Sequence, residues 1–226
     1  MRLAGWRGAA VAGLATLILS IAFRWIPGLE PCGPSGGSGA VIGFELVRSP
    51  AELDALFGTG TCRATMASAQ RAALWLDMLG FIPAYALFFA LSGSLLANAH
   101  RHLGPLAAAF ALSAAILDQA EGVILHYLLD TLPGTQSWID ALWWTVRPKF
   151  ALLSLAEGAI AAILIWGPRH WESVPAVAMA GGAMLSFAML VFHPHAALMM
   201  QGHAIAWVSL FVVAASRAFV PPRASS

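Results

Sequence analysis

Long apolar stretches separated by short polar segments dominate the chain. Six of them are long enough to cross the roughly 30 Å hydrocarbon core of a bilayer as α-helices, at about 1.5 Å per residue. They cover Ala9–Ile26, Ala72–Ala99, Leu106–Leu129, Phe150–Trp166, Val174–Phe192 and Ala196–Ser216. The pattern predicts an all-α, polytopic membrane bundle of six transmembrane helices. Residues 1–226 are expected to form a single membrane domain, because no other segment is long enough for a second, soluble one.

Several prolines are expected to mark the ends of these helices. Pro105, Pro148 and Pro175 lie near predicted first turns, where a missing amide hydrogen costs nothing. Pro83 lies inside the second stretch and is expected to kink that helix.

The composition excludes a soluble enzyme and a nucleic-acid-binding protein. Hydrophobic residues make up 59% of the 226 residues and charged residues only 10%, whereas soluble domains carry about 25% charged residues. The mean hydropathy is +0.76. A net charge of +1 gives no sign of a nucleic-acid partner, and the expected surrounding is the lipid bilayer.

The distribution of arginine and lysine predicts the orientation. With a cytoplasmic N-terminus, the inner segments hold six arginines in about 30 residues, and the outer segments hold five basic residues in about 68. This favours both termini inside (N-in/C-in), in a bacterial-type inner, or plasma, membrane. Arg2 and Arg7 before an apolar run also fit a signal peptide, but the run continues to Ile26, which favours a retained helix.

One long outer loop, about 27–71, is expected between the first two helices. It holds the only two cysteines, Cys32 and Cys62. In an oxidising outer compartment these two residues are expected to form a disulfide that closes a loop of about 30 residues.

The same loop contains a helix signal. Ser49-Pro50-Ala51-Glu52 is a capping box with proline at the first helical position. It predicts a short helix that ends at Gly58, with Leu53, Leu56 and Phe57 on one side. We expect this helix to be a packed connection over the end of the bundle, with a lid over a site as the alternative.

Charged side chains inside the apolar stretches are the strongest candidate chemistry. Asp77, Asp118, Glu121 and Glu157 would each cost about 2.5–3.5 kcal/mol at the bilayer centre if unpaired. Asp118 and Glu121 are three residues apart, so they share one face of their helix. Lys149 is the only lysine in the chain and stands just before the fourth stretch.

The topology brings these groups to a similar depth. Asp77, Glu157 and His203 are expected roughly 8–12 Å below the outer boundary of the membrane. The third helix runs outward, which carries its two carboxylates to the middle and outer region and His126 to the rim. The predicted polar intramembrane site therefore comprises Asp77, Asp118, Glu121, Lys149, Glu157, His126 and His203.

Three hypotheses fit this layer of charge. We favour proton- or cation-linked transport of a small solute, because intramembrane acids and histidines are typical of proton relays. The first alternative is an accessory or assembly subunit of a larger membrane complex, in which buried charges only hold helices in register. A homodimer would also provide close helix packing or the missing half of a transporter.

The second alternative is an intramembrane metal-dependent hydrolase that acts on a lipid or a membrane peptide. His193, His195 and His203 are candidate ligands for zinc, or for copper, and a nearby carboxylate would serve as general base. Their spacing matches no common zinc motif, and neither His-Glu-x-x-His nor a phosphate-binding glycine loop occurs. We expect no bound cofactor, with zinc or copper as the alternative. The sequence leaves open whether the protein is an enzyme.

Overall fold

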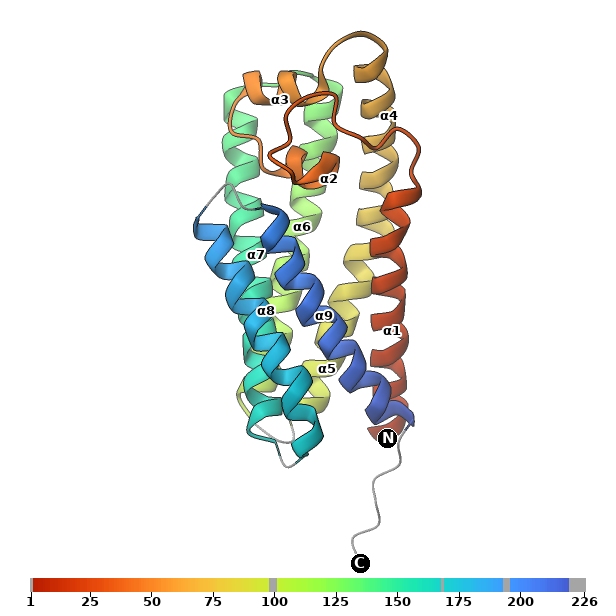
Figure 1. The fold of residues 1–226 in the computed structure, drawn as a ribbon, viewed down its shortest axis with the longest axis vertical. Helices are drawn as coiled ribbons and strands as arrows, with labels where there is room; N and C mark the ends of the chain where they lie inside the picture. Colours follow the sequence, from red (N-terminus) through yellow and green to blue (C-terminus); the bar gives the residue numbers. More distant parts are fainter. Residues whose placement is uncertain (1, 98–100, 168, 193–195, 220–226) are drawn as a thin grey trace, which may run out of the picture.

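The computed structural model describes residues 2–97, 101–167, 169–192 and 196–219, and helix is the only regular structure in these ranges. The long helices are α1 (Arg2–Ala22), α4 (Gly60–Leu76), α5 (Ile82–Leu96), α6 (Leu103–Asp130), α7 (Gln136–Ile165), α8 (Ser173–Val191) and α9 (Ala196–Phe219). Two short helices, α2 (Gly39–Glu45) and α3 (Pro50–Phe57), lie in the connection between α1 and α4. Figure 1 shows the long helices running up and down in one bundle.

Six helical segments in the described part of the chain are long and apolar enough to cross a membrane, as predicted. They are Leu3–Trp25, Gly60–Leu96, Leu103–Asp130, Gln136–Ile165, His170–Val191 and Ala196–Phe219. Helices next to each other in sequence pack side by side, and α1 packs against α9, so the bundle closes into a ring. Both ends of the described chain lie at the same end of the bundle, as an even number of crossings requires (Figure 1).

Three helical segments begin well before the predicted spans. The first begins at Leu3 rather than Ala9, the second at Gly60 rather than Ala72, and the fourth at Gln136 rather than Phe150. Hydropathy marks only the part of a helix that lies in lipid, whereas these helices continue beyond it. Pro148 consequently lies inside α7 and not at its first turn. The outer loop is shorter than predicted, because its last residues already belong to α4.

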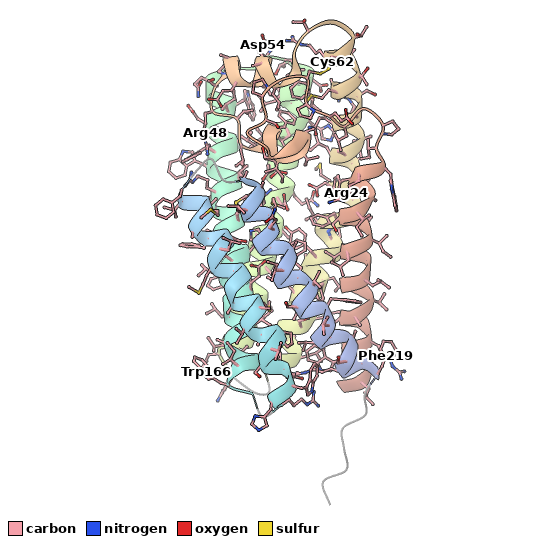
Figure 2. The ribbon with its side chains drawn as sticks, in the orientation of Figure 1. Arg24, Arg48, Asp54, Cys62, Trp166 and Phe219 are labelled. Atoms are coloured by element: carbon pink, nitrogen blue, oxygen red, sulfur yellow. A yellow bond between two sulfur atoms is a disulfide. The ribbon has the colours of Figure 1, made fainter. Side chains whose placement is uncertain are left out.

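The helices differ in length, which creates a cap on one end of the bundle. Helix α8 has 19 residues, about 28 Å at 1.5 Å per residue, which just spans the hydrocarbon core. Helix α7 has 30 residues, about 45 Å long. Helices α4, α6 and α7 therefore extend past the ends of α8 and α9, and α2 and α3 lie among these extensions (Figure 1). We call this the capped end; Figure 2 shows Asp54 and Cys62 there, and Trp166 and Phe219 at the opposite end.

Covalent and local bonds hold the cap. Cys32 and Cys62 form the predicted disulfide, which ties the connection to the first turn of α4. The capping box of α3 is also present: the Ser49 hydroxyl accepts a hydrogen bond from the amide of Glu52 at 3.2 Å. The carboxylate of Glu52 in turn accepts one from the amide of Arg48 at 2.7 Å.

The α3 helix is a packed connection, as expected. Leu53 and Phe57 are fully buried, and the helix ends before Gly58, which has a positive φ of 59°. Phe57 packs edge-on against Phe44 of α2, with ring centroids 5.1 Å apart. The amide of Gln70 in α4 donates to the carbonyl of Ala40 in α2 at 2.7 Å, which joins α2 to the bundle.

The predicted kink at Pro83 takes the form of a widened turn. Residues Asp77–Phe81 form a π-helical turn between α4 and α5. Proline has no amide hydrogen to donate to the carbonyl of Met78, five residues earlier. The side-chain amide of Gln119 in α6 donates to this carbonyl at 2.7 Å instead.

Close backbone contact joins α8 to α9. A Cβ atom at Gly182 would meet the carbonyl oxygen of Gly202, and Ser186 donates to the carbonyl of Met199 at 2.8 Å. Small residues at this crossing let the helices approach, which is a main source of association within lipid.

Adding one methyl group at the crossing should therefore destabilise the bundle. We expect Gly182→Ala to lower the free energy of unfolding by about 1–3 kcal/mol, as overpacking does, seen as a fall of several degrees in Tm in detergent. The matched control is Gly181→Ala, because a Cβ there has no neighbour within 4 Å. The control should melt at or slightly above the wild-type temperature, since alanine favours helix. Equal effects of the two changes would contradict tight packing at Gly182.

Candidate functional site

Lys149 lies at the centre of a buried charged network below the cap. Its Nζ atom is 3.0 Å from Oε2 of Glu45, 2.9 Å from Oδ1 of Asp118 and 2.6 Å from Oε2 of Glu121. All four side chains are at most 8% exposed. We call these four residues the Lys149 network. It contains one ammonium group and three carboxyl groups with little exposure to solvent.

Three separate elements supply the network. Glu45 is the last residue of α2 and enters from the cap, whereas Asp118 and Glu121 share a face of α6, as predicted. Lys149 follows Pro148 in α7. The hydroxyl of Tyr85 in α5 donates to Oδ2 of Asp118 at 2.8 Å, so a fourth helix holds the carboxylate in place.

Asp77 lies within electrostatic reach of this network. Its carboxyl group interacts with the charges of Asp118, Lys149 and Glu45. Asp77 belongs to the π-helical turn Asp77–Phe81. Such turns frequently occur at functional sites. A fourth acidic group therefore lies within electrostatic range of the single lysine.

Glu45, which enters the network from the cap, has a pKa above its usual value. Burial raises the pKa of the Glu45 carboxyl above 4.5, and the negative field of Asp118 adds to this. The positive charge of Lys149 opposes both effects without cancelling them. Glu45 therefore holds its proton more tightly in the folded protein than in the unfolded chain.

A second buried polar cluster joins α7 to α9. Nδ1 of His203 is 2.8 Å from Oε1 of Glu157, and the indole Nε1 of Trp207 donates to the same oxygen at 2.6 Å. Glu157 is fully buried and His203 is 2% exposed. Oε2 of Glu157 and Nε2 of His203 are buried and have no hydrogen-bond partner among the residues that the structure describes. We call Glu157 and His203 the Glu157 cluster; the ring of Trp207 borders it.

Aromatic rings separate the two clusters. The rings of Tyr85 and Trp207 have centroids 5.4 Å apart. The ring of Phe150 lies 4.5 Å from Nζ of Lys149 and stacks on His203 at 5.5 Å. One layer of rings, made by Tyr85, Phe150 and Trp207, thus contacts both clusters.

The structure divides the predicted polar site into parts. Asp118, Glu121 and Lys149 come together, with Asp77 within electrostatic range, while Glu157 and His203 form their own cluster. His126 packs against Trp75 instead, with ring centroids 5.0 Å apart.

Three contributing residues were missed from the sequence. Tyr85 and Trp207 resemble ordinary apolar-helix aromatics, and nothing in their spacing marks their polar atoms. Glu45 did carry a signal, because it is a lone acid inside the apolar run Val41–Val47 of the connection. A charge in such a run is expected to be buried and paired.

The predicted metal ligands are only partly described. His193 and His195 lie outside the described residues, and Nδ1 of His203 faces Glu157. Within the ranges that the structure describes, no group of three or more His, Cys, Asp or Glu residues has an arrangement that would hold a metal ion. The zinc or copper site at His193, His195 and His203 stays a prediction.

Comparison with known proteins gives no family assignment. No protein-family model, no curated protein and no solved structure matches the chain. The described part of the chain is a helical bundle with six helices long and apolar enough to cross a membrane and with salt-bridged charges buried in its interior.

Removing the only lysine should leave three buried carboxyl groups without a cation. We expect Lys149→Met to destabilise the protein by about 3–5 kcal/mol, the cost of breaking a buried pair by removing one partner. The measurement is thermal unfolding of the purified protein in detergent. The triple variant Lys149→Met, Asp118→Asn, Glu121→Gln should recover much of the loss. A Lys149→Met protein that melts like wild type would show that the ammonium group is not what holds the network.

The raised pKa of Glu45 gives the network a defined pH dependence. Below about 4.5 both folded and unfolded chains are protonated at this carboxyl. As the pH rises toward the folded-state pKa, the unfolded chain loses the proton first, so the contribution of Glu45 to stability falls by at most about 1.4 kcal/mol per pH unit. Unfolding measured from acid to neutral pH should show this fall in wild type relative to Glu45→Gln.

An exposed acid of the same connection provides the control. Glu30→Gln should follow wild type at every pH, because Glu30 is solvent-exposed. A wild-type advantage over Glu45→Gln that grows with pH would contradict the prediction, since it would mean that the ion pair with Lys149 outweighs burial.

Proposed function

We propose that the protein is a proton-linked transporter of a small solute in a bacterial-type inner membrane, with both termini inside. The Lys149 network is the site that binds and releases the proton. The observation that carries this proposal is the imbalance of one buried ammonium group against three buried carboxyl groups.

Electroneutrality argues for proton binding. If Glu45, Asp118 and Glu121 were all ionised, the network would hold two uncompensated negative charges beside the membrane interior. Each such charge costs several kcal/mol, and a group in this position takes up a proton instead. A site that must hold protons in one state and can lose them in another is what proton coupling needs.

A buried acid at the opposite end of the bundle shows what a purely structural arrangement looks like. Glu172 is fully buried and accepts two hydrogen bonds from Arg217, at 2.7 and 2.5 Å, with Arg169 at 3.3 Å. There two cations compensate one carboxylate, so no proton is required. The opposite ratio at Lys149 supports a role beyond holding helices together.

The cap offers the network a route to water. Glu45 is the one acid of the network that lies outside the membrane-spanning helices, at the end of a seven-residue helix. A small displacement of α2 would expose Lys149 to the capped end, which is the outside in the proposed orientation. Proton exchange on that side therefore needs no movement of a spanning helix.

The Glu157 cluster is the proposed inward partner. Its unpartnered Oε2 and Nε2 atoms can accept or hold a proton, and the layer formed by Tyr85, Phe150 and Trp207 separates it from Lys149. Because the Tyr85 hydroxyl donates to Asp118, a proton can pass between the clusters only when these rings move. The bound solute would then act by rearranging these rings.

Neutralising two acids tests the proton site directly. Asp118→Asn with Glu121→Gln leaves Lys149 paired with Glu45, a one-to-one arrangement that should still fold. We expect infrared difference spectra between acid and alkaline pH to show the C=O band of buried protonated carboxyl groups in wild type, strongly reduced in the variant. In liposomes with an internal pH dye and a panel of small solutes, we expect proton uptake that depends on one solute class and falls at least tenfold in the variant.

The control for both measurements is Glu30→Gln, which removes an exposed acid and should behave like wild type. If the double variant changed only the melting temperature, and no solute moved protons with wild type, the proposal would be wrong. The accessory-subunit interpretation would then account for the buried charges.

A further inference from the structure

Two arginines lie on one tryptophan ring at the capped end. The guanidinium carbon of Arg48 is 3.3 Å from the ring centroid of Trp143, and that of Arg147 is 4.0 Å from it. Arg147 donates to the carbonyl of Leu190 at 2.7 Å. Among the residues described, neither guanidinium group forms an ion pair with an acid. Two like charges on one ring favour a bound anion.

Arg48 is the less satisfied of the two. Its Nη2 atom is buried and has no hydrogen-bond partner in the described structure. Burial and the nearby charge of Arg147 lower the pKa of Arg48 to about 10, although Glu52 partly opposes this. A guanidinium group gains most from a planar oxyanion that accepts two hydrogen bonds.

A cavity of about 410 Å³ opens beside this arginine. Arg48, Ile139, Asp140, Trp143 and Trp144 line it. The volume is enough for a small polar group. Figure 2 shows Arg48 at the flank of the bundle beside α7, and Trp144 is 72% exposed on the same helix.

The cavity lies at the depth of lipid headgroups. Leu190, whose carbonyl accepts from Arg147, is the last residue but one of α8. Since α8 just spans the hydrocarbon core, Arg147 marks its boundary. Trp143 is four residues, about 6 Å, further out along α7, within the interfacial layer of roughly 5–7 Å on each side. Tryptophan and arginine are typical of this layer.

We propose that this cavity binds the headgroup of a membrane phospholipid, with its phosphate against Arg48. Arg147, whose guanidinium carbon is 4.0 Å from the centroid of the same Trp143 ring, adds positive charge nearby. The carboxylate of Asp140, which accepts from Gln136 at 2.9 Å, lines the same cavity. An acid next to two arginines complements a zwitterionic headgroup, so the preferred lipid carries an amine, as phosphatidylethanolamine does.

Native mass spectrometry of the full chain in phosphate-free detergent tests this site. Phosphatidylethanolamine, phosphatidylglycerol and inorganic phosphate are titrated separately. Wild type should bind one phosphatidylethanolamine at least tenfold more tightly than Arg48→Gln does. The matched control Arg71→Gln removes an exposed arginine that pairs with Asp130, and it should bind like wild type.

A second pair of variants keeps the test valid if Arg48→Gln fails to fold. Trp144→Ala removes an exposed wall of the cavity and should weaken lipid binding, whereas Trp25→Ala, equally exposed but away from the cavity, should not. Asp140→Asn should abolish the preference for phosphatidylethanolamine over phosphatidylglycerol. The proposal is overturned if these cavity variants bind lipid like wild type, or if inorganic phosphate binds at Arg48 and lipid does not.

Discussion

The buried ammonium group of Lys149 is the interaction on which the capped end depends. It joins the short helix α2 to α6 and α7, and through Asp118 it reaches Tyr85 of α5. In lipid the alternative to such a pair is a charge in a medium that cannot solvate it, so moving any one of these elements away from the others carries an electrostatic cost. At the depth of Lys149, the bundle therefore contains a charged site formed by several elements in place of an apolar core.

The aromatic layer beneath the network separates two kinds of polar environment. Above it, one cation faces several acids; below it, Glu157 shares one oxygen between His203 and Trp207. Rings are well suited to this position because they exclude water yet present polar edges, as Trp207 does toward Glu157. In the proposed function, a proton that passes between the two clusters would have only this thin layer of rings between them.

The sequence could predict the spans and most residues of the polar site, but not that these residues would form two separate clusters. Apolar length determines what crosses lipid, so six spans follow from it, whereas the extension of α7 to Gln136 depends on packing against the cap, which hydropathy does not record. Helical spacing placed Asp118 and Glu121 on one face. Depth alone, however, could not separate Glu157 from Lys149, because rotation about a helix axis decides which neighbour a side chain meets. The pairing of Glu45 with Lys149 could not be predicted either, because it depends on where the short helix α2 packs in the folded protein.

The connection after α2 links the two sites of the capped end. Glu45 and Arg48 are three residues apart, and Leu46 and Val47 between them are buried, so this segment cannot move at one end alone. Glu45 reaches inward to Lys149, while Arg48 lies on Trp143 at the lipid-facing side. A headgroup that held Arg48 would keep Glu45 over Lys149 and the network closed to water. Loss of the headgroup would free α2 to withdraw, so the lipid around the protein would set how readily the network exchanges its proton.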